Sequence, residues 1–410
     1  MRVKETDAQV RETTAGIIGR VRTRGDAALR ELAVDFDRQK LAKIEVPASA
    51  VGSALQCLDP ALRSALERAA RNIEAVHSAS PPMSVEVEPE AGIVVGRRPD
   101  ALTRVGAYAP GGRAAYASSV LMCAIPARVA GVEEIVVCSP PAKNGVPSAI
   151  VLAACAIAKV DRVFSVGGAG AIAAMAFGTE TIPAVNKIVG PGNAYVAEAK
   201  AQVSRFVGID SPAGPSELLV ICDESSDPDT VAAEVLAQAE HDPDACVVIV
   251  ALSESYADRV ASAVAAAIAT IERASIARDA LKANGALLVA RDAAEALEFS
   301  SDYAPEHLLL AAVDAPRLAA VARNSGCVFI GESSSVVFGD YISGGNHVLP
   351  TAGAARSYSG LGPLDFVRWT SYQRISRDAA ESLALDTARL AEAEGLGAHS
   401  AAARRWSEAR

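Results

Sequence analysis

The sequence predicts an α/β protein with parallel sheets, and three observations support this fold class. Short apolar, β-branched runs alternate with longer Ala-rich stretches that are typical of helices. The apolar runs lack alternating polar residues, which indicates strands that are buried on both faces. The chain has 410 residues, of which 50% are hydrophobic and 21% charged, so it can fill more than one core. A chain of this length suggests two or three domains.

The expected strands and helices follow one another along most of the chain. The strands are expected within residues 132–140, 161–168, 216–223, 244–253, 285–292, 307–313 and 326–333. The helical stretches between them include 145–159, 228–241 and 254–283. Asp227 followed by Pro228 is an N-cap with proline at the first helical position. The helix that they start is expected to end before Pro243.

The C-terminal residues are expected to form a helical tail. A helix is predicted from Ser382 to Glu394, with a break at Gly395 and Gly397 and a second helix through Arg405. The tail follows a Gly- and Ser-rich stretch at 352–363, and we expect no strand in it. This pattern indicates an appendage rather than part of a sheet.

Charge and hydropathy argue against two classes of partner. The formal net charge is −10 and basic residues are not clustered, so nucleic acid is not expected to bind. No apolar run reaches the roughly 18–20 residues that span a bilayer. The charged N-terminus lacks the apolar core of a secretory signal, so we expect a cytoplasmic protein that does not enter the membrane.

The seven cysteines form no CxxC pair, and several lie inside apolar runs. We expect them to be buried, reduced thiols, because free cysteine often packs as a small hydrophobic residue. A nucleophilic cysteine is the alternative, and no neighbouring residue supports it.

Two short clusters contain residues that can do chemistry. Gln238 and His241 lie three residues apart near a helix end, so an amide oxygen and an imidazole nitrogen can reach one zinc ion. Helix capping is the alternative role for this pair. Glu306 and His307 precede a strand, where the two side chains can serve as bases with different pKa values. An ordinary surface loop is the alternative there.

Several Gly-rich stretches could bring backbone close to a ligand. Asp340 and His347 bracket such a turn, although turn formation alone also explains its composition. Glu394 and His399 flank the glycine break in the tail. Two further stretches lie at 107–112 and 190–193, and a third at 166–172 follows a strand and precedes a helix. The third could bind phosphate at a helix N-terminus, but it lacks the full GxGxxG pattern.

Taken together and in order, eight segments resemble the histidinol dehydrogenase family over nearly the whole chain. They are residues 108–132, 166–183, 187–200, 208–220, 238–245, 305–308, 339–351 and 394–399. The resemblance implies two incomplete Rossmann-like domains, one inserted in the other, and a helical C-terminal dimerisation tail. The first domain would comprise 1–107 with 217–361, the inserted domain 108–216 and the tail 362–410.

The resemblance also implies a role for each candidate residue. Gln238, His241 and Asp340 look like zinc ligands, and His399 looks like a further ligand from the partner subunit's tail. Glu306 and His307 resemble the catalytic pair. The positions that match substrate contacts are Ser216, Gln238, His241, His307, Asp340, His347, Glu394 and His399. The positions that match NAD contacts are Tyr108, Gly170 and Asn193.

The activity that the resemblance implies is a two-step, four-electron oxidation of L-histidinol to L-histidine by NAD through bound histidinal. His307 would take the alcohol proton and Glu306 would activate water, while zinc would anchor the substrate's imidazole and amine. The protein would act as a cytoplasmic homodimer with a shared active site. One alternative is a paralogue that oxidises another primary alcohol or amino alcohol, and a second is a catalytically silent zinc- or metabolite-binding protein. Intact Glu394, His347 and His399 favour histidinol, and intact Glu306 and His307 count against a silent protein.

The chain departs from the family pattern at three positions and has a shorter N-terminal arm. Gly170 replaces the usual Gln, Ala117 the usual Pro and Gly345 the usual Thr. Gly170 has no side chain that can donate a hydrogen bond to the dinucleotide. We therefore expect weaker NAD binding than in a relative with Gln.

Overall fold

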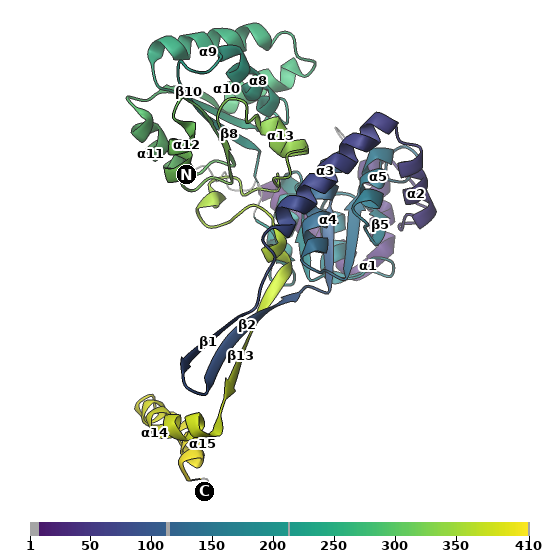
Figure 1. Cartoon of the computed structure of the whole chain (residues 1–410). Coiled ribbons are helices and arrows are strands. Elements are labelled where there is room, and N and C mark those ends of the chain that lie inside the picture. Colours follow the sequence, from purple (N-terminus) through teal and green to yellow (C-terminus); the bar gives the residue numbers. More distant parts are fainter. Residues whose placement is uncertain (1–7, 112–114, 212–213, 409–410) are drawn as a thin grey trace. The chain divides into compact units, whose positions relative to one another are not determined.

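The computed structural model of this chain describes residues 8–111, 115–211 and 214–408 (Figure 1). By their internal contacts the residues divide into two compact units. The first unit comprises Met1–Ser80 and Leu102–Phe366, and the second comprises Pro81–Ala101 and Val367–Arg410. Within the described ranges, no helix combines the length and the apolar character that a membrane crossing requires.

The first unit contains a sheet of five parallel strands in the order β5-β4-β3-β6-β7. Its strands are β3 (Arg104–Tyr108), β4 (Glu134–Ser139), β5 (Arg162–Ser165), β6 (Lys187–Val189) and β7 (Gly208–Ile209). Ile135 and Val137 of β4 pack into one apolar cluster, whereas Val136 and Cys138 pack into another on the opposite face. Both faces are therefore buried, as the unbroken apolar runs predict.

Helices cover both faces of this first sheet. They are α1 (Ala8–Asp37), α2 (Ala48–Gln56), α3 (Pro60–Ser78), α4 (Ala117–Val129), α5 (Ala149–Ile157), α6 (Gly168–Phe177) and α7 (Ala194–Val203). Helices α2, α3, α4 and α5 pack together on one face (Figure 1). Helix α1 packs against α6 and α7 on the other face.

A second sheet of the same unit repeats this topology with the order β10-β9-β8-β11-β12, again all parallel. Its strands are β8 (Glu217–Cys222), β9 (Cys246–Ala251), β10 (Gly285–Val289), β11 (His307–Ala311) and β12 (Cys327–Ile330). The helices that accompany it are α8 (Pro228–Ala239), α9 (Glu254–Ala267), α10 (Ala274–Asn284), α11 (Ala293–Tyr303), α12 (Ala315–Val321) and α13 (Val336–Tyr341). Two short 3-10 helices follow at Ala354–Arg356 and Pro363–Phe366. The two Rossmann-like parallel sheets predicted from the sequence are confirmed.

The strand order places a ligand-binding position in the first sheet. The chain starts in the middle of the sheet, crosses to one edge, and then reverses direction between β3 and β6. In open α/β sheets, ligands bind beyond the carboxyl ends of the strands at this switch point. Tyr108 is the last residue of β3, and Gly190 follows β6 directly. In the second sheet the candidate catalytic residues Glu306 and His307 lie at the amino ends of the strands instead, because His307 is the first residue of β11.

The N-terminal helices belong with the first sheet, which differs from the expected grouping of 1–107 with 217–361. Leu29 and Leu32 of α1 are buried in the cluster that contains the apolar residues of α6. The first sheet also begins at Arg104, four residues before the expected boundary at 108. The apolar face of a helix predicts that this face is buried, but the sequence does not indicate which sheet it packs against.

The second unit is a three-stranded antiparallel ribbon followed by two helices (Figure 1). Its elements are β1 (Val85–Glu90), β2 (Ile93–Ala101), β13 (Val367–Ile375), α14 (Arg377–Ala393) and α15 (Gly397–Glu408). The helical tail with its break at Gly395 is confirmed, and Gly395 there adopts a φ of 76°. The expectation that the tail contains no strand was wrong, because β13 pairs with β2 along its whole length. This strand is half-exposed and rich in polar residues, so its sequence lacks the apolar run of a buried strand.

Candidate active site

Glu306 and His307 lie side by side at the amino end of β11, between β8 and β12 of the second sheet. Their exposed fractions are 6% and 4%. The backbone of Glu217, at the start of the neighbouring strand β8, holds both side chains. Glu217 N donates to Glu306 Oε2 over 2.8 Å, and His307 Nδ1 donates to Glu217 O over 3.0 Å. Because the carbonyl can only accept, His307 carries hydrogen on Nδ1, which leaves Nε2 free to exchange a proton.

The two side chains are close enough to set each other's charge. His307 Nδ1 lies 3.6 Å from Glu306 Oε2, and His307 Nε2 lies 3.5 Å from Asp340 Oδ1. Burial raises the pKa of Glu306 to about 7, although the neighbouring imidazole opposes this shift. Burial also disfavours the charged form of His307, but Glu306 and Asp340 outweigh it and raise the pKa of His307 to about 9. A carboxylate that titrates near neutrality is suited to general base catalysis.

Asp340 and His347 line a small cavity together with His307. The cavity has a volume of about 50 Å³ and is lined by His307, Asp340, His347 and seven neighbouring residues. His347 Nδ1 donates to the main-chain oxygen of Asp340 over 2.7 Å, and its Nε2 lies 3.2 Å from Ser119 Oγ on α4. Burial lowers the pKa of His347. The structure therefore brings three of the predicted residues to one enclosed space.

The loop between Asp340 and His347 is fastened to the helices of the first sheet. Asn72 of α3 donates to Ile342 O, and Asn346 donates to Met122 O of α4, each over 2.7 Å. Gly344 adopts a φ of 104°, and a Cβ there would lie 2.6 Å from Asn72 O. Only glycine fits such a close approach with positive φ. The loop thus ties the helices of one sheet to the candidate catalytic residues of the other.

Gln238 and His241 lie at the carboxyl end of α8. Gln238 is 3% exposed, and its amide nitrogen is buried without a hydrogen-bond partner within the described part of the chain. His241 Nδ1 donates to Ala237 O over 2.9 Å, which leaves the Nε2 lone pair available. Helix α13, which carries Asp340, begins on the same helix α8, because Val336 N donates to Glu234 Oε2 over 3.0 Å. The structure therefore places Asp340 next to the helix that carries Gln238.

These donors suit zinc in kind but do not form a complete site within one chain. An amide oxygen, an imidazole nitrogen and a carboxylate are all ligands that zinc accepts. The orphaned amide of Gln238 and the free Nε2 of His241 fit this use. Nevertheless, in residues 8–111, 115–211 and 214–408 no three His, Cys, Asp or Glu side chains could together hold a metal ion. Glu394 and His399 are exposed residues of the second unit.

The candidate cofactor residues gather at the carboxyl edge of the first sheet. Tyr108 is 4% exposed, and its hydroxyl accepts from Gly168 N at the start of α6 over 3.0 Å. Burial raises the pKa of Tyr108 to about 12, so its hydroxyl stays neutral. Asn193 caps α7, with Oδ1 accepting from Tyr195 N and Val196 N over 3.1 Å each. Gly112 of the Gly-rich stretch 107–112, and Pro212 and Ala213 of segment 208–220, lie outside the described residues.

Gly170 sits in the first turn of α6 and faces the N-terminal helix. A Cβ on Gly170 would lie 3.0 Å from Leu32 Cδ1 and 3.5 Å from Leu29 Cδ2, both on α1. Its φ is not positive, so backbone strain does not require glycine here. A side chain at this position would leave the backbone toward α1.

Three contributors to the site were missed by the sequence reasoning. They are Glu217, Ser119 and Glu234, which hold the catalytic pair, His347 and α13 respectively. Glu217 alone gave a usable signal, because it is a carboxylate at the head of an apolar strand and such groups are rarely buried without a partner. Cys327, next to His307 on β12, is not a nucleophile candidate, since burial raises the pKa of its thiol.

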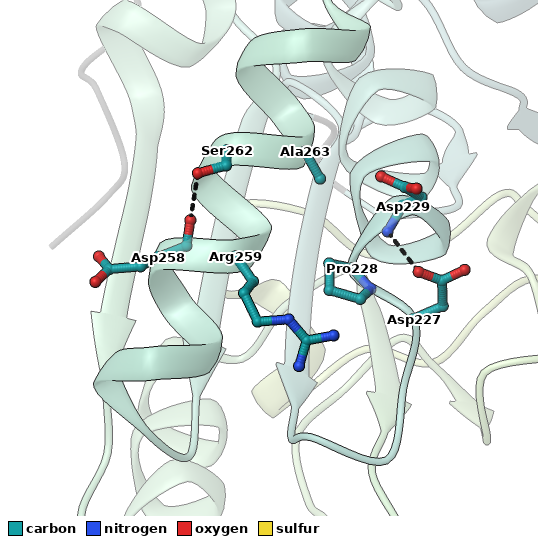
Figure 2. A pocket seen from close by; sticks show the side chains of 7 residues that line it. All are labelled: Asp227, Pro228, Asp229, Asp258, Arg259, Ser262 and Ala263. Carbon is teal, nitrogen blue, oxygen red and sulfur yellow. Dashed lines mark hydrogen bonds between the residues drawn. The ribbon is translucent and has the colours of Figure 1, made fainter.

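The larger surface hollow lies elsewhere, at the amino end of α8 (Figure 2). Its volume is about 490 Å³, and the residues that line it are Asp227, Pro228, Asp229, Asp258, Arg259, Ser262 and Ala263. Asp227 accepts from Asp229 N over 3.1 Å, which confirms its predicted N-cap role (Figure 2). Gln238 lies ten residues further along α8, or roughly 15 Å. The hollow contains none of the candidate site residues.

Comparison with known proteins agrees with this geometry. The family model described as histidinol dehydrogenase matches residues 1–406. A histidinol dehydrogenase of Methanosarcina mazei is 46% identical over 395 residues, covering 96% of this chain and 90% of that protein. One from Nitrosomonas europaea is 45% identical over 400 residues, covering 97% and 92%. The crystal structure of histidinol dehydrogenase from Elizabethkingia anophelis superposes with a TM-score of 0.94 at 35% identity, covering 99% of this chain and 93% of that one. The chain therefore belongs to the histidinol dehydrogenase family of oxidoreductases.

Proposed function

We propose that this protein oxidises L-histidinol to L-histidine in two NAD-linked steps, through histidinal that stays bound. The observation that carries the proposal is the buried pair Glu306 and His307, which Glu217 fixes. His307 of this pair lines one cavity together with Asp340 and His347. Family membership adds the substrate that the relatives' names state.

The two catalytic side chains have separate tasks in this scheme. Because the pKa of His307 is raised to about 9, its neutral form is the minor one at neutral pH. That neutral form accepts the alcohol proton at Nε2 while a hydride leaves the carbinol carbon, which gives the aldehyde. Glu306 accepts a proton from water, whose oxygen adds to the aldehyde carbon and forms a hydrate. Loss of a second hydride from the hydrate gives the acid. NAD supplies the hydride acceptor in both steps, so that two molecules of NADH form for each histidinol.

Zinc is the metal that the donor set favours. Gln238, His241 and Asp340 would hold it together with His399 of the partner subunit. When bound there, zinc anchors the imidazole and amine of the substrate as a template. Ser216, just before β8, lies beside Glu217, and it is a proposed substrate contact together with His347 and Glu394. Tyr108 and Asn193 would bind NAD at the switch point of the first sheet.

A steady-state assay tests the proposal directly. We expect the zinc-loaded protein to release two NADH per L-histidinol consumed, and one per histidinal supplied. Removal of zinc by chelation should abolish turnover, and added zinc should restore it. The double variant Glu306→Gln/His307→Ala, which lacks both proposed bases and is purified in the same way, is the control for contaminating dehydrogenases. Turnover of another amino alcohol in preference to histidinol would favour a paralogue, and no turnover with any alcohol would favour a silent binding protein.

A further inference from the structure

A buried ion pair lies beside the carboxyl end of β6, among residues to which no role has yet been given. Lys200 of α7 and Asp210 after β7 form it in direct contact, with exposed side-chain fractions of 2% and 6%. Taking two charges out of water is costly, and well-packed apolar side chains in the same place are often at least as stable. The stability of the fold alone therefore does not explain why two charged residues, Lys200 and Asp210, are buried at this position.

Both members of the pair also bind the backbone of Gly190. Lys200 Nζ donates to Gly190 O over 3.1 Å, and Gly190 N donates to Asp210 Oδ2 over 2.8 Å. The amide and the carbonyl of one residue are thus each bound to a charged side chain. Hydrogen bonds with a charged partner are roughly twice as strong as neutral ones. This backbone position is therefore held firmly from both sides.

Gly190, the residue that Lys200 and Asp210 hold, lies where the ends of β3 and β6 meet. Gly190 has a φ of 112°, and a Cβ there would lie 2.3 Å from Tyr108 O. The backbone after β6 therefore passes directly over the end of β3, which only glycine permits. Fixing Gly190 fixes the approach of the segment 190–193 to Tyr108.

The same helix fastens the other end of this segment. Asn193 caps α7 through its side-chain oxygen, and α7 carries Lys200 about two turns further on. Segment 190–193 is thus bound to α7 at its last residue by the cap and at its first residue by Lys200. Asp210 adds a third anchor from the neighbouring strand.

We propose that Lys200 and Asp210 are positioning residues that hold segment 190–193 so that Tyr108 and Asn193 face NAD in one fixed geometry. The inference rests on the proposed use of NAD. Neither residue touches the reacting atoms, and both act through the backbone of Gly190. The pair should therefore govern NAD affinity rather than the chemical steps.

The double variant Lys200→Met/Asp210→Asn tests this inference, since it removes both charges and leaves none unpaired. The amide oxygen of Asn can still accept from Gly190 N, whereas Gly190 O loses its donor. Calorimetric titration of the zinc-loaded enzyme should show an NAD dissociation constant raised by about tenfold, the effect of one or two lost hydrogen bonds. The KM for NAD should rise in parallel, while kcat at saturating NAD and the KM for histidinol stay unchanged. A folded double variant with unaltered NAD affinity would overturn the inference.

A partly exposed ion pair at the amino ends of the strands of the same sheet provides the control. Arg104 Nε and Glu134 Oε2 lie 2.5 Å apart at the amino ends of β3 and β4, far from the switch point along those strands. Arg104→Met/Glu134→Gln should lower thermal stability without changing NAD affinity. An equal loss of NAD affinity in this control would show general loosening of the sheet and reject a positioning role.

Two further measurements separate the possible failures. If the first double variant does not fold, Lys200→Arg retains the charge and a donor to Gly190 but alters their geometry. It should bind NAD more weakly than the unaltered enzyme, and unchanged affinity would again overturn the inference. The unaltered enzyme is titrated alongside. If it does not bind NAD, the proposed function fails and the inference falls with it, whereas normal binding by every variant rejects the inference alone.

Discussion

Glu306 and His307 owe their placement to one backbone position on another strand. In the register of β8 and β11, His307 is opposite Leu218, so that Glu306 comes to lie beside Glu217. The sequence places the two catalytic candidates next to each other, but it does not show that they will be buried or which residue will bind them. Their electrostatic properties therefore come from the sheet, and they can be tested at single residues.

The raised pKa of Glu306 predicts an acid limb in the second oxidation. Only the ionised carboxylate can accept a proton from water, and burial raises its pKa to about 7. The rate with histidinal should therefore fall as the pH drops through 7 and level off above it. Glu306→Gln should lower that rate by about 10²–10⁴-fold, the usual effect of losing a general base, and should remove the limb.

The pH profile is measured with histidinal at saturating NAD, and zinc content is checked at each pH because acid also releases the metal. The first oxidation serves as the internal comparison, since it does not require water activation. Survival of the same limb in the Glu306→Gln protein would assign it to another group.

Gly170 yields a second prediction at the residue scale, in which packing and binding oppose each other. A side chain here gains helix propensity of about 1 kcal/mol over glycine. Its Cβ, however, meets Leu32 Cδ1 at 3.0 Å, and overpacking of a core typically costs about 1–3 kcal/mol. Gly170→Gln alone should therefore lower the thermal midpoint. Combined with Leu32→Val, which makes room on α1, it should bind NAD about 2–13-fold more tightly through one added hydrogen bond.

Calorimetry with NAD and thermal unfolding of both proteins check this prediction, with Leu32→Val alone as the control. If the combined variant is stable and its NAD affinity does not improve, Gly170 is not a cofactor position in this chain.

At the scale of elements, α13 is the part of the site that sequence patterns describe least well. It has six residues, and the backbone of its first residue is held by Glu234, one turn before Gln238 on α8. Asp340 can therefore meet Gln238 and His241 only if α13 stays docked on α8. Glu234 is 6% exposed and acts as a remote support for a proposed ligand.

Glu234→Ala is expected to loosen the metal site more than the fold. Removing the acceptor leaves the amide of Val336 unsatisfied, and loss of such outer partners typically lowers metal affinity by about 10–100-fold. Competition with a chromophoric chelator measures the zinc affinity. Glu234→Gln keeps an acceptor oxygen and should bind zinc nearly normally. Equal zinc affinity in all three proteins would show that α13 docks without this contact.

The elements also show where prediction from sequence succeeds and where it stops. Strands such as β8 and β11 were foreseen because continuous apolar runs can only be buried on both faces. Strand β13 was missed because the pattern of a ribbon exposed to solvent lacks that apolar signal. The association of α1 with α6 was also missed, since it depends on which apolar face meets Leu29 and Leu32 in three dimensions.

For the site as well, some residues could be predicted from the sequence and others could not. Chemistry-bearing residues such as His307 and His347 stand out through their type and through family resemblance. The residues that orient them, Ser119 and Glu217, have ordinary sequence contexts, and their roles depend on contacts between segments far apart in the chain.

For the whole molecule, the second unit has a composition that suits assembly. Among its described residues, the buried apolar side chains are Ile93 and four alanines, Ala379, Ala384, Ala388 and Ala391. Larger apolar side chains are left exposed, namely Leu385 at 47%, Leu390 at 69%, Leu396 at 43% and Trp406 at 51%. A small ribbon with a weak core gains stability from packing against another surface. A second copy of the chain is the partner that the proposed function requires, because the partner subunit's His399 would complete the zinc site.

Hybrid dimers test this shared site. His241→Ala removes a proposed ligand from α8, and His399→Ala removes one from α15, so that each protein alone should lose zinc-dependent turnover. In a mixed dimer that contains one chain of each kind, one of the two sites would receive His241 from one chain and His399 from the other. That site is intact, while the second lacks both ligands. Random exchange in an equal mixture should therefore restore about a quarter of normal activity, since half of the dimers are hybrid and each has one working site.

Subunit exchange is followed independently with differently tagged chains, and mixing His241→Ala with Asp340→Ala is the control. Those two ligands belong to the same chain, so hybrids would have no intact site and should stay inactive. Full exchange without recovery in the His241→Ala and His399→Ala mixture would place His399 in the site of its own chain or outside the site altogether.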